Sequence, residues 1–110
     1  MAGSYVLKKS VDGQFYFLLY SDNGEVVLNS EMYVAKASAE NGIASVQSNS
    51  TQDDRYSRNQ ASNGRFYFNL KAANHQVIGS SQMYSTTSAR DAGIHAVKKN
   101  GPNTNIKDEA

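Results

Sequence analysis

The stretch GRFYFNLKAANHQVIGSSQMY at residues 64–84 decides the fold, because residues 13–33 read almost the same, GQFYFLLYSDNGEVVLNSEMY. With a constant offset of 51 and no gap, 14 of the 37 positions in 13–49 are identical to their counterparts in 64–100. Such a match indicates an internal duplication. We expect one domain over residues 1–110, built of repeat 1 (3–51), repeat 2 (54–102) and a C-terminal strand or tail (103–110).

Each repeat contains the pattern of three short strands joined by two turns. Asp-Gly or Asn-Gly pairs flank the aromatic strand, except that Asn74-His75 follows it in repeat 2, and such pairs favour tight type I′ hairpin turns. In the aromatic strand, Phe15 and Phe17 alternate with Tyr16, as Phe66 and Phe68 alternate with Tyr67, so the phenylalanines should face the core. The strands are predicted near residues 4–9, 14–20 and 25–29, and again near 55–60, 65–71 and 76–80.

A helix is predicted after the third strand of each repeat, near residues 35–48 and 86–99. Ile43 and Val46, like Ile94 and Val97, have the spacing of one helix face. Ser85 is the expected N-cap of the second helix, whereas the first helix has no such residue. Glycine inside each helix, at 42 and 93, costs about 1 kcal/mol relative to alanine, which predicts close approach of the helix to the sheet.

A single repeat of this length is too small to bury a stable core alone. The fold class is therefore expected to be α+β, with the two tandem repeats forming one antiparallel sheet, both helices on one face and a pseudo-twofold axis between the halves. Because the duplication would replace a homodimer, we expect a monomer.

The motifs shared by the two repeats resemble those of the YegP-like family of bacterial proteins of unknown function, in its tandem-repeat form. They are Asn23/Asn74, Phe15–Phe17/Phe66–Phe68, Ser30–Tyr33/Ser81–Tyr84 and Gly42–Val46/Gly93–Val97. The resemblance implies β3-α-β units in one sheet, with the strand after each helix exchanged between units. It would make residues 53–59 the strand after the first helix, running straight into the role of first strand of repeat 2, and it would make the tail the matching last strand. The family offers no established activity.

Composition excludes several functional classes. The chain has no cysteine, so disulfides, thiolate metal sites and cysteine nucleophiles are absent. The formal net charge is +1, and no run of eighteen apolar residues occurs, so neither a nucleic-acid field nor a membrane partner is indicated. The expected location is cytoplasmic. His75 and His95 have no partners at metal-ligand spacing, and we predict no catalytic residue, metal or cofactor.

The tyrosines are the best candidates for a binding site. Tyr16 and Tyr67 should lie on the sheet face away from the helices, close to Arg65 and Lys71. Three functions remain open, in decreasing order of support. The first is a small non-enzymatic module that binds a ligand or a protein partner. The second is a single-stranded nucleic-acid binder that uses the open face. The third is an enzyme.

Overall fold

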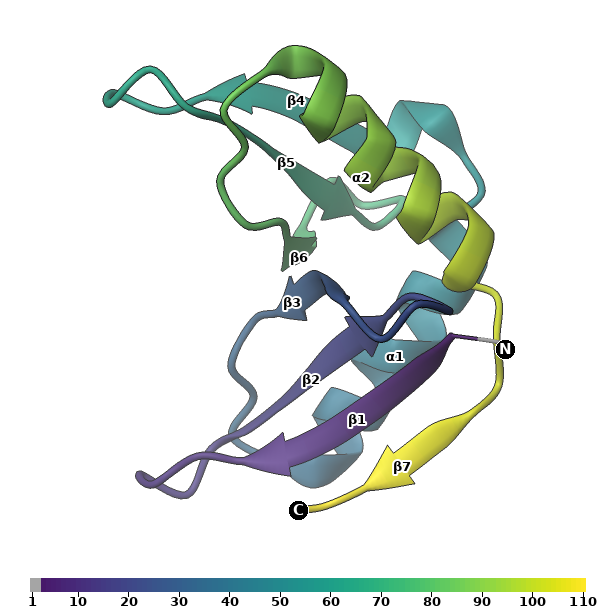
Figure 1. Ribbon diagram of the computed structural model, residues 1–110. Helices are drawn as coiled ribbons and strands as arrows, with labels where there is room; N and C mark the ends of the chain where they lie inside the picture. Colours follow the sequence, from purple (N-terminus) through teal and green to yellow (C-terminus); the bar gives the residue numbers. More distant parts are fainter. Residues whose placement is uncertain (1–2) are drawn as a thin grey trace.

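The structure is a computed structural model that describes residues 3–110, and it contains one seven-stranded sheet and two helices (Figure 1). Both helices begin and end within one residue of their predicted bounds. The elements are β1 (Ser4–Lys9), β2 (Phe15–Tyr20), β3 (Val26–Ser30), α1 (Lys36–Asn49), the 3₁₀ turn η1 (Asp53–Arg55), β4 (Tyr56–Gln60), β5 (Phe66–Lys71), β6 (Val77–Ser80), α2 (Thr87–Asn100) and β7 (Ile106–Asp108).

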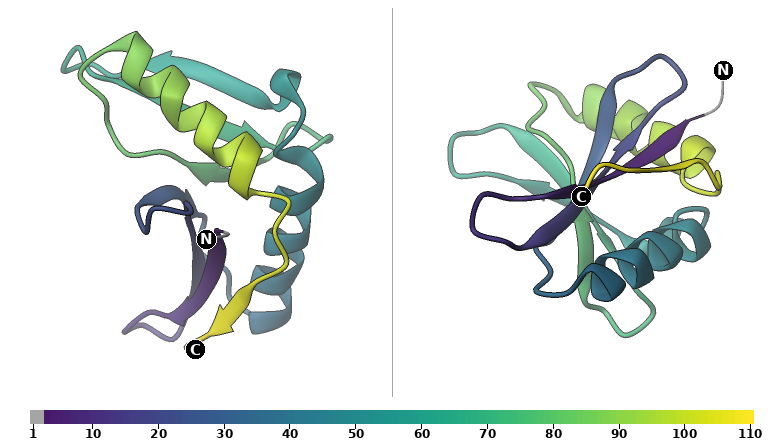
Figure 2. Two further views of the ribbon diagram at one scale, coloured as in Figure 1. Left: turned by 45° about the vertical axis from the view of Figure 1, so that its right-hand side comes forward. Right: turned by 90° about the horizontal axis from the view of Figure 1, so that it is seen from below.

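The two repeats join at the middle of the sheet. The strand order is β4-β5-β6-β3-β2-β1-β7, and β3 pairs with β6 through Asn29 opposite Ser80 and Ser30 opposite Gly79. Both helices cover the same face of the sheet (Figures 1 and 2), where Phe17 and Phe68 are fully buried in one shared core. The predicted α+β fold of two tandem repeats is confirmed.

The hairpin turns differ from the predicted type I′ geometry. In the first turn, the Gly13 amide donates to the Ser10 carbonyl, and the Ser10 amide donates to the Gln14 carbonyl. Gly13 has a φ of +86°, but Asp12 does not have a positive φ, whereas type I′ requires one at both central residues. The arrangement is therefore a type I turn followed by a bulged residue. It recurs in all four hairpins, with His75 taking the glycine's place at a φ of +70°.

The helix starts correct one prediction. The N-cap of α2 is Thr86, whose hydroxyl accepts a hydrogen bond from the Ala89 amide at 3.0 Å, and not Ser85. The hydroxyl one position later is the one placed to reach a free amide of the first turn. Ala35 occupies the N-cap of α1 and makes no side-chain bond, as expected from the sequence.

The tail also corrects the expected strand pattern. β7 pairs in parallel with β1, with Ile106 opposite Tyr5, so the sheet is antiparallel except at this edge. The direction follows from the end of α2, because the Tyr5 hydroxyl near the start of β1 donates to the Gly101 carbonyl at 2.6 Å. The chain leaving α2 therefore starts beside the beginning of β1 and must run along it in the same direction.

The strand that follows α1 is itself the first strand of repeat 2, as the resemblance allowed. Residues 53–55 make the turn η1, and β4 begins directly at Tyr56. In the structure only α2 is thus followed by an added edge strand, and the outer edge of β4 carries none.

The C-terminal ends of the two helices meet between the repeats. Ser50 and Gly101, which are equivalent positions 51 residues apart, are the C-caps of α1 and α2. A methyl group at Gly101 would lie 2.2 Å from the Ser50 Oγ, and both residues are buried. The Tyr56 hydroxyl donates to the Ser50 carbonyl at 2.6 Å, which mirrors the bond from Tyr5 to Gly101. Each repeat thus closes the helix end of the other.

Candidate binding surface

The sheet face that points away from both helices, called the open face below, carries the predicted site residues. Successive side chains of a strand point to opposite faces. Phe17 and Leu19 are fully buried beneath the helices, so Tyr16 points to the open face, and the same alternation places Tyr67 there on β5. Both tyrosines are half-buried.

A continuous row of paired residues crosses the centre of the open face. The backbone register aligns one residue from each of six strands, namely Val6, Leu18, Asn29, Ser80, Asn69 and Ser57. The Ser80 hydroxyl donates to the Asn69 side-chain oxygen at 2.8 Å. The row is apolar on β1 and β2 and polar on the other four strands, so the centre of the face offers hydrogen-bonding groups.

The four predicted site residues share this face but do not converge on one pocket. Tyr16 and Tyr67 lie on β2 and β5, which run in opposite directions with β3 and β6 between them, so their strands are about 14 Å apart. The two rings flank the central row on opposite sides. Arg65 is exposed just before β5, and Lys71 is half-buried at its end, beyond a bulge. An extended surface, and not a cavity, is what these residues form.

The other two duplicated tyrosine pairs have structural roles. Tyr5 and Tyr56 are buried and donate to helix-end carbonyls, and burial raises the pKa of both hydroxyls. Tyr33 stacks on Phe17, with ring centroids 6.4 Å apart, and Tyr84 stacks on Phe68 in the same way. Their hydroxyls fill the space above Gly42 and Gly93, where a methyl group would approach within 2.5 and 2.4 Å.

Tyr16 and Tyr67 remain without such a role. Within residues 3–110, neither hydroxyl has a hydrogen-bond partner and neither ring has an aromatic partner. The duplicated serines, by contrast, are structural: Ser30 and Ser81 accept from the Phe17 and Phe68 amides at 2.8 and 2.9 Å. Of the aromatic side chains kept in both repeats, only Tyr16 and Tyr67 are left free to contact a ligand.

A groove beside β7 extends the open face of repeat 1. It has a volume of about 730 Å³, and its lining includes Val6, Lys8, Tyr20, Lys107 and Glu109. Comparison of the repeats did not reveal this groove, because Ile106–Asp108 are identical at no position to their repeat counterparts at 55–57 and the comparison could not place the tail. The alternation of β2 was the available signal, since it puts Tyr20 on the same face as Tyr16.

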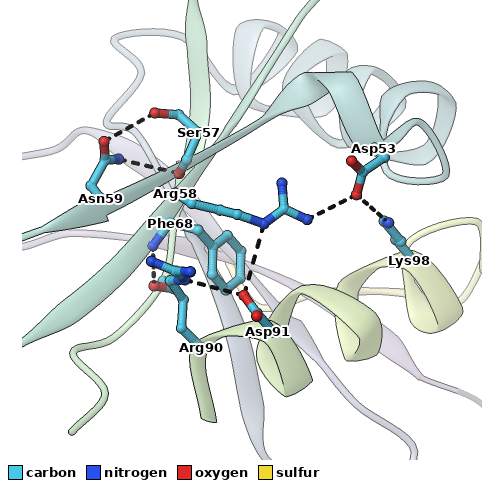
Figure 3. A network of polar contacts seen from close by, with 9 residues as sticks. Asp53, Ser57, Arg58, Asn59, Phe68, Arg90, Asp91 and Lys98 are labelled. Atoms are coloured by element: carbon cyan, nitrogen blue, oxygen red, sulfur yellow. Dashed lines mark hydrogen bonds and ion pairs between the residues drawn. The ribbon is translucent and has the colours of Figure 1, made fainter. Parts of the chain in front are cut away.

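A network of ion pairs on the helix side covers the outer part of repeat 2 (Figure 3). Asp53 binds Lys98 at 2.6 Å and Arg58 at 2.9 Å, and Arg58 and Arg90 both approach Asp91. Hydrogen bonds from Lys98 and then Arg58 lower the pKa of the Asp53 carboxyl to about 2. A carboxyl held ionised in this way is a poor proton donor, and its ion pairs link η1, β4 and α2.

Arg58 also explains how the uncovered edge of β4 is protected. It takes the position of Leu7 in repeat 1, which is fully buried, but Arg58 is exposed. A charge at an inward-facing position of an edge strand discourages pairing with another chain. β7 covers the corresponding edge of β1.

The remaining titratable residues include His95, which lies on α2. His95 is exposed and lines a second groove of about 360 Å³ between α2 and the hairpin of β2 and β3, together with Asp22 and Lys99. A hydrogen bond from Lys99 lowers the pKa of Asp22. Within residues 3–110 no group of three or more histidine, aspartate or glutamate side chains could hold a metal ion.

Comparison with known proteins places the chain in a family. The sequence profile described as "Domain of unknown function (DUF1508)" matches twice, at residues 10–57 and 61–108. The chain belongs to this family. The UPF0339 protein YegP of Escherichia coli K12 is 60% identical over 108 residues, which is 98% of each chain. A UPF0339 protein of Pseudomonas aeruginosa is 46% identical over 110 residues and all of both chains. The resemblance seen in the sequence is thereby confirmed.

Two solution NMR structures of relatives have the same fold. The structure of YegP from E. coli, described as a protein of unknown function, superposes with a TM-score of 0.94 at 60% identity, covering 99% of this chain and 94% of the other. That of a UPF0339 protein from Shewanella oneidensis gives a TM-score of 0.92 at 57% identity, covering 98% and 92%. No helix within residues 3–110 is long and apolar enough to cross a membrane.

Proposed function

We propose that the protein is a small non-catalytic binding module that contacts its ligand through the open face. One observation carries this proposal. Of the three tyrosine pairs kept through the duplication, two have structural roles in hydrogen bonding or ring stacking, and within the described residues 3–110 the pair Tyr16 and Tyr67 has neither. Tyrosine and arginine are enriched where surfaces bind partners, and Tyr67 on β5 lies between Arg65, just before that strand, and Lys71 at its end.

The two halves of the proposed surface are not equivalent. Tyr16 and Tyr67 are kept, but Gln14 corresponds to Arg65 and Tyr20 corresponds to Lys71. The groove beside β7 adds a further difference. A ligand therefore meets chemically distinct groups on either side of the pseudo-twofold axis and binds in one orientation.

The test is a ligand-observed NMR screen by saturation transfer, using a panel of nucleotides, sugar phosphates, short peptides and oligonucleotides. We expect Tyr16→Ser combined with Tyr67→Ser to abolish or weaken binding of any panel member that the parent binds. Val34→Ser is the matched control, since Val34 is 83% exposed and lies in the segment just before α1, outside the strands that form the open face. A folded double variant that binds as tightly as the parent would refute the proposed surface.

A further inference from the structure

The charged side chains of the strands and tail are sorted between the two faces of the sheet. Strand alternation and register place four cations and one acid on the open face, namely Lys8, Arg65, Lys71, Lys107 and Glu109. The chain has 11 cations and 10 acids, so the rest of the molecule holds seven cations and nine acids. These strand and tail residues of the open face thus carry +3, and the remaining charged residues of the chain sum to −2, although the net charge of the chain is only +1.

The cations also differ in how far they are neutralised. On the helix side, six lysines and arginines have an acidic partner within 4.0 Å: Lys36, Arg55, Arg58, Arg90, Lys98 and Lys99. On the open face, Lys8 has a long contact of 3.7 Å to Glu109, while Arg65, Lys71 and Lys107 have no such partner within residues 3–110. Lys9, on the helix side, also has no acidic partner there and lies over the Phe15 ring. Three of the four cations without an acidic partner within residues 3–110 therefore lie on the face that carries the free tyrosines.

The tyrosines and these cations are spread across the sheet. From β5, with Arg65, Tyr67 and Lys71, to β1, with Lys8, there are four strand spacings, or about 19 Å. Tyr16 and Tyr20 lie between them on β2, and the groove with Lys107 continues beyond β1. A ligand that satisfied all of these groups would be long, repeatedly negative and equipped with flat rings.

We infer that the open face binds single-stranded nucleic acid, with the backbone phosphates on the cations and bases stacked on Tyr16, Tyr20 and Tyr67. This inference rests on the proposed function and names the ligand class for the same surface. Aromatic rings on a sheet stack bases that are free of a duplex, and a cationic surface follows the backbone. The polar side chains of the central row, Asn29, Asn69 and Ser80, lie between the rings and supply donors and acceptors for base edges.

The geometry favours this ligand over duplex DNA and over an anionic membrane. Both helices lie on the opposite side of the sheet, so neither can enter a major groove from the open face. Among the exposed large apolar side chains, Ile106 lines the groove, and alternation from the bridged residues Tyr33 and Tyr84 directs Met32 and Met83 toward the open face. These are single side chains on separate segments, and the row that crosses the face is polar on four of its six strands, which suits a nucleic acid better than insertion into lipid.

The test is fluorescence anisotropy of a labelled 12-nucleotide single strand, as DNA and as RNA of mixed sequence, titrated with the whole protein at 20 to 200 mM salt. Three or four neutralised phosphates predict a slope of log K against log salt of about −2 to −3. Combining Arg65→Gln, Lys71→Gln and Lys107→Gln should reduce that slope by about 2. Lys99→Gln is the matched control, because it removes one charge from the helix side, and it should leave the slope unchanged.

The stacking contribution is measured separately. Tyr16→Ser and Tyr67→Ser should each weaken binding roughly 5- to 150-fold at constant salt slope. Equal or tighter binding of a hairpin duplex, preference for anionic lipid vesicles, or no oligonucleotide binding at 20 mM salt would each overturn the nucleic-acid assignment. In those cases the screen described under the proposed function still tests the open face with other ligands. Loss of binding in Lys99→Gln equal to that in the triple variant would overturn the choice of face.

Discussion

Gly101→Ala should destabilise the protein even though it replaces a glycine whose backbone already has helical angles. Gly101 has φ −57° and ψ −39°, so alanine fits the backbone and would by itself stabilise by about 0.5–1 kcal/mol through the unfolded state. The added methyl group, however, would lie 2.2 Å from the Oγ and 2.4 Å from the Cβ of Ser50, which is fully buried. Overpacking of this kind costs about 1–3 kcal/mol.

The expected net loss is about 1–2 kcal/mol, which for a chain of this length corresponds to a fall in Tm of roughly 4–9 °C. Thermal unfolding followed by circular dichroism measures it. The matched background is Ser50→Gly, which removes the obstructing side chain and also a buried hydroxyl without a hydrogen-bond partner. In that background Gly101→Ala should be neutral or stabilising, and the double-mutant cycle should show a coupling of about 1–2 kcal/mol. A higher Tm for Gly101→Ala in the parent, or the same loss in both backgrounds, would show that the helix ends do not meet as described.

Three further predictions concern the core, the ion network and a buried hydroxyl. Gly93→Leu should lower the Tm despite the better helix propensity of leucine, because the Tyr84 hydroxyl occupies the space that the new side chain needs; a raised Tm would show that the glycine is merely tolerated. Asp53→Asn should make the Tm fall less steeply as the pH is lowered into the acidic range. The folded pKa of about 2 lies below the unfolded value near 3.9, so this stabilisation is complete above pH 5 and disappears as the pH falls toward 2; Tm curves of equal steepness for both proteins between pH 5 and pH 2 would argue against it. Tyr56→Phe should cost about 1–3 kcal/mol, since the Ser50 carbonyl loses its donor, and unchanged denaturant midpoints would speak against that bond.

The strands and helices were predictable because the signals that specify them are local. Alternation around Phe17 and Phe68 fixed the core face of the central strands, and the spacing of Ile43 and Val46 fixed the buried face of α1. The second repeat showed the same helix pattern in a different sequence. Using both copies, we predicted the bounds of α1 and α2 to within one residue.

The errors arose where local patterns do not determine geometry. An Asp-Gly pair is compatible with type I′ and with a type I turn plus a bulge, so Asp12 and Gly13 did not reveal the hairpin type. The parallel direction of β7 depends on where α2 ends in space, and Ile106–Asp108 are identical at no position to their repeat counterparts at 55–57.

The sequence predicted only part of the candidate surface. Tyr16 and Tyr67 could be placed on the open face by counting residues along their strands. The positive charge of that face could not be predicted, because the net charge of +1 combines +3 from the strand and tail residues of the open face with −2 from the rest of the chain. In addition, pairings such as Lys36 with Asp108 join residues 72 positions apart. Which cations remain free is a property of the folded chain.

The central claim is that ligands meet the open face of the sheet, and amide chemical-shift mapping tests it most directly. The ¹⁵N-labelled protein is titrated with the 12-nucleotide single strand and with each positive member of the screening panel. We predict that the largest shift changes fall on β1, β2, β5 and the residues lining the groove beside β7, while α1 and α2 change little. Shift changes confined to the two helices, or to the second groove between α2 and the hairpin of β2 and β3, would contradict the account.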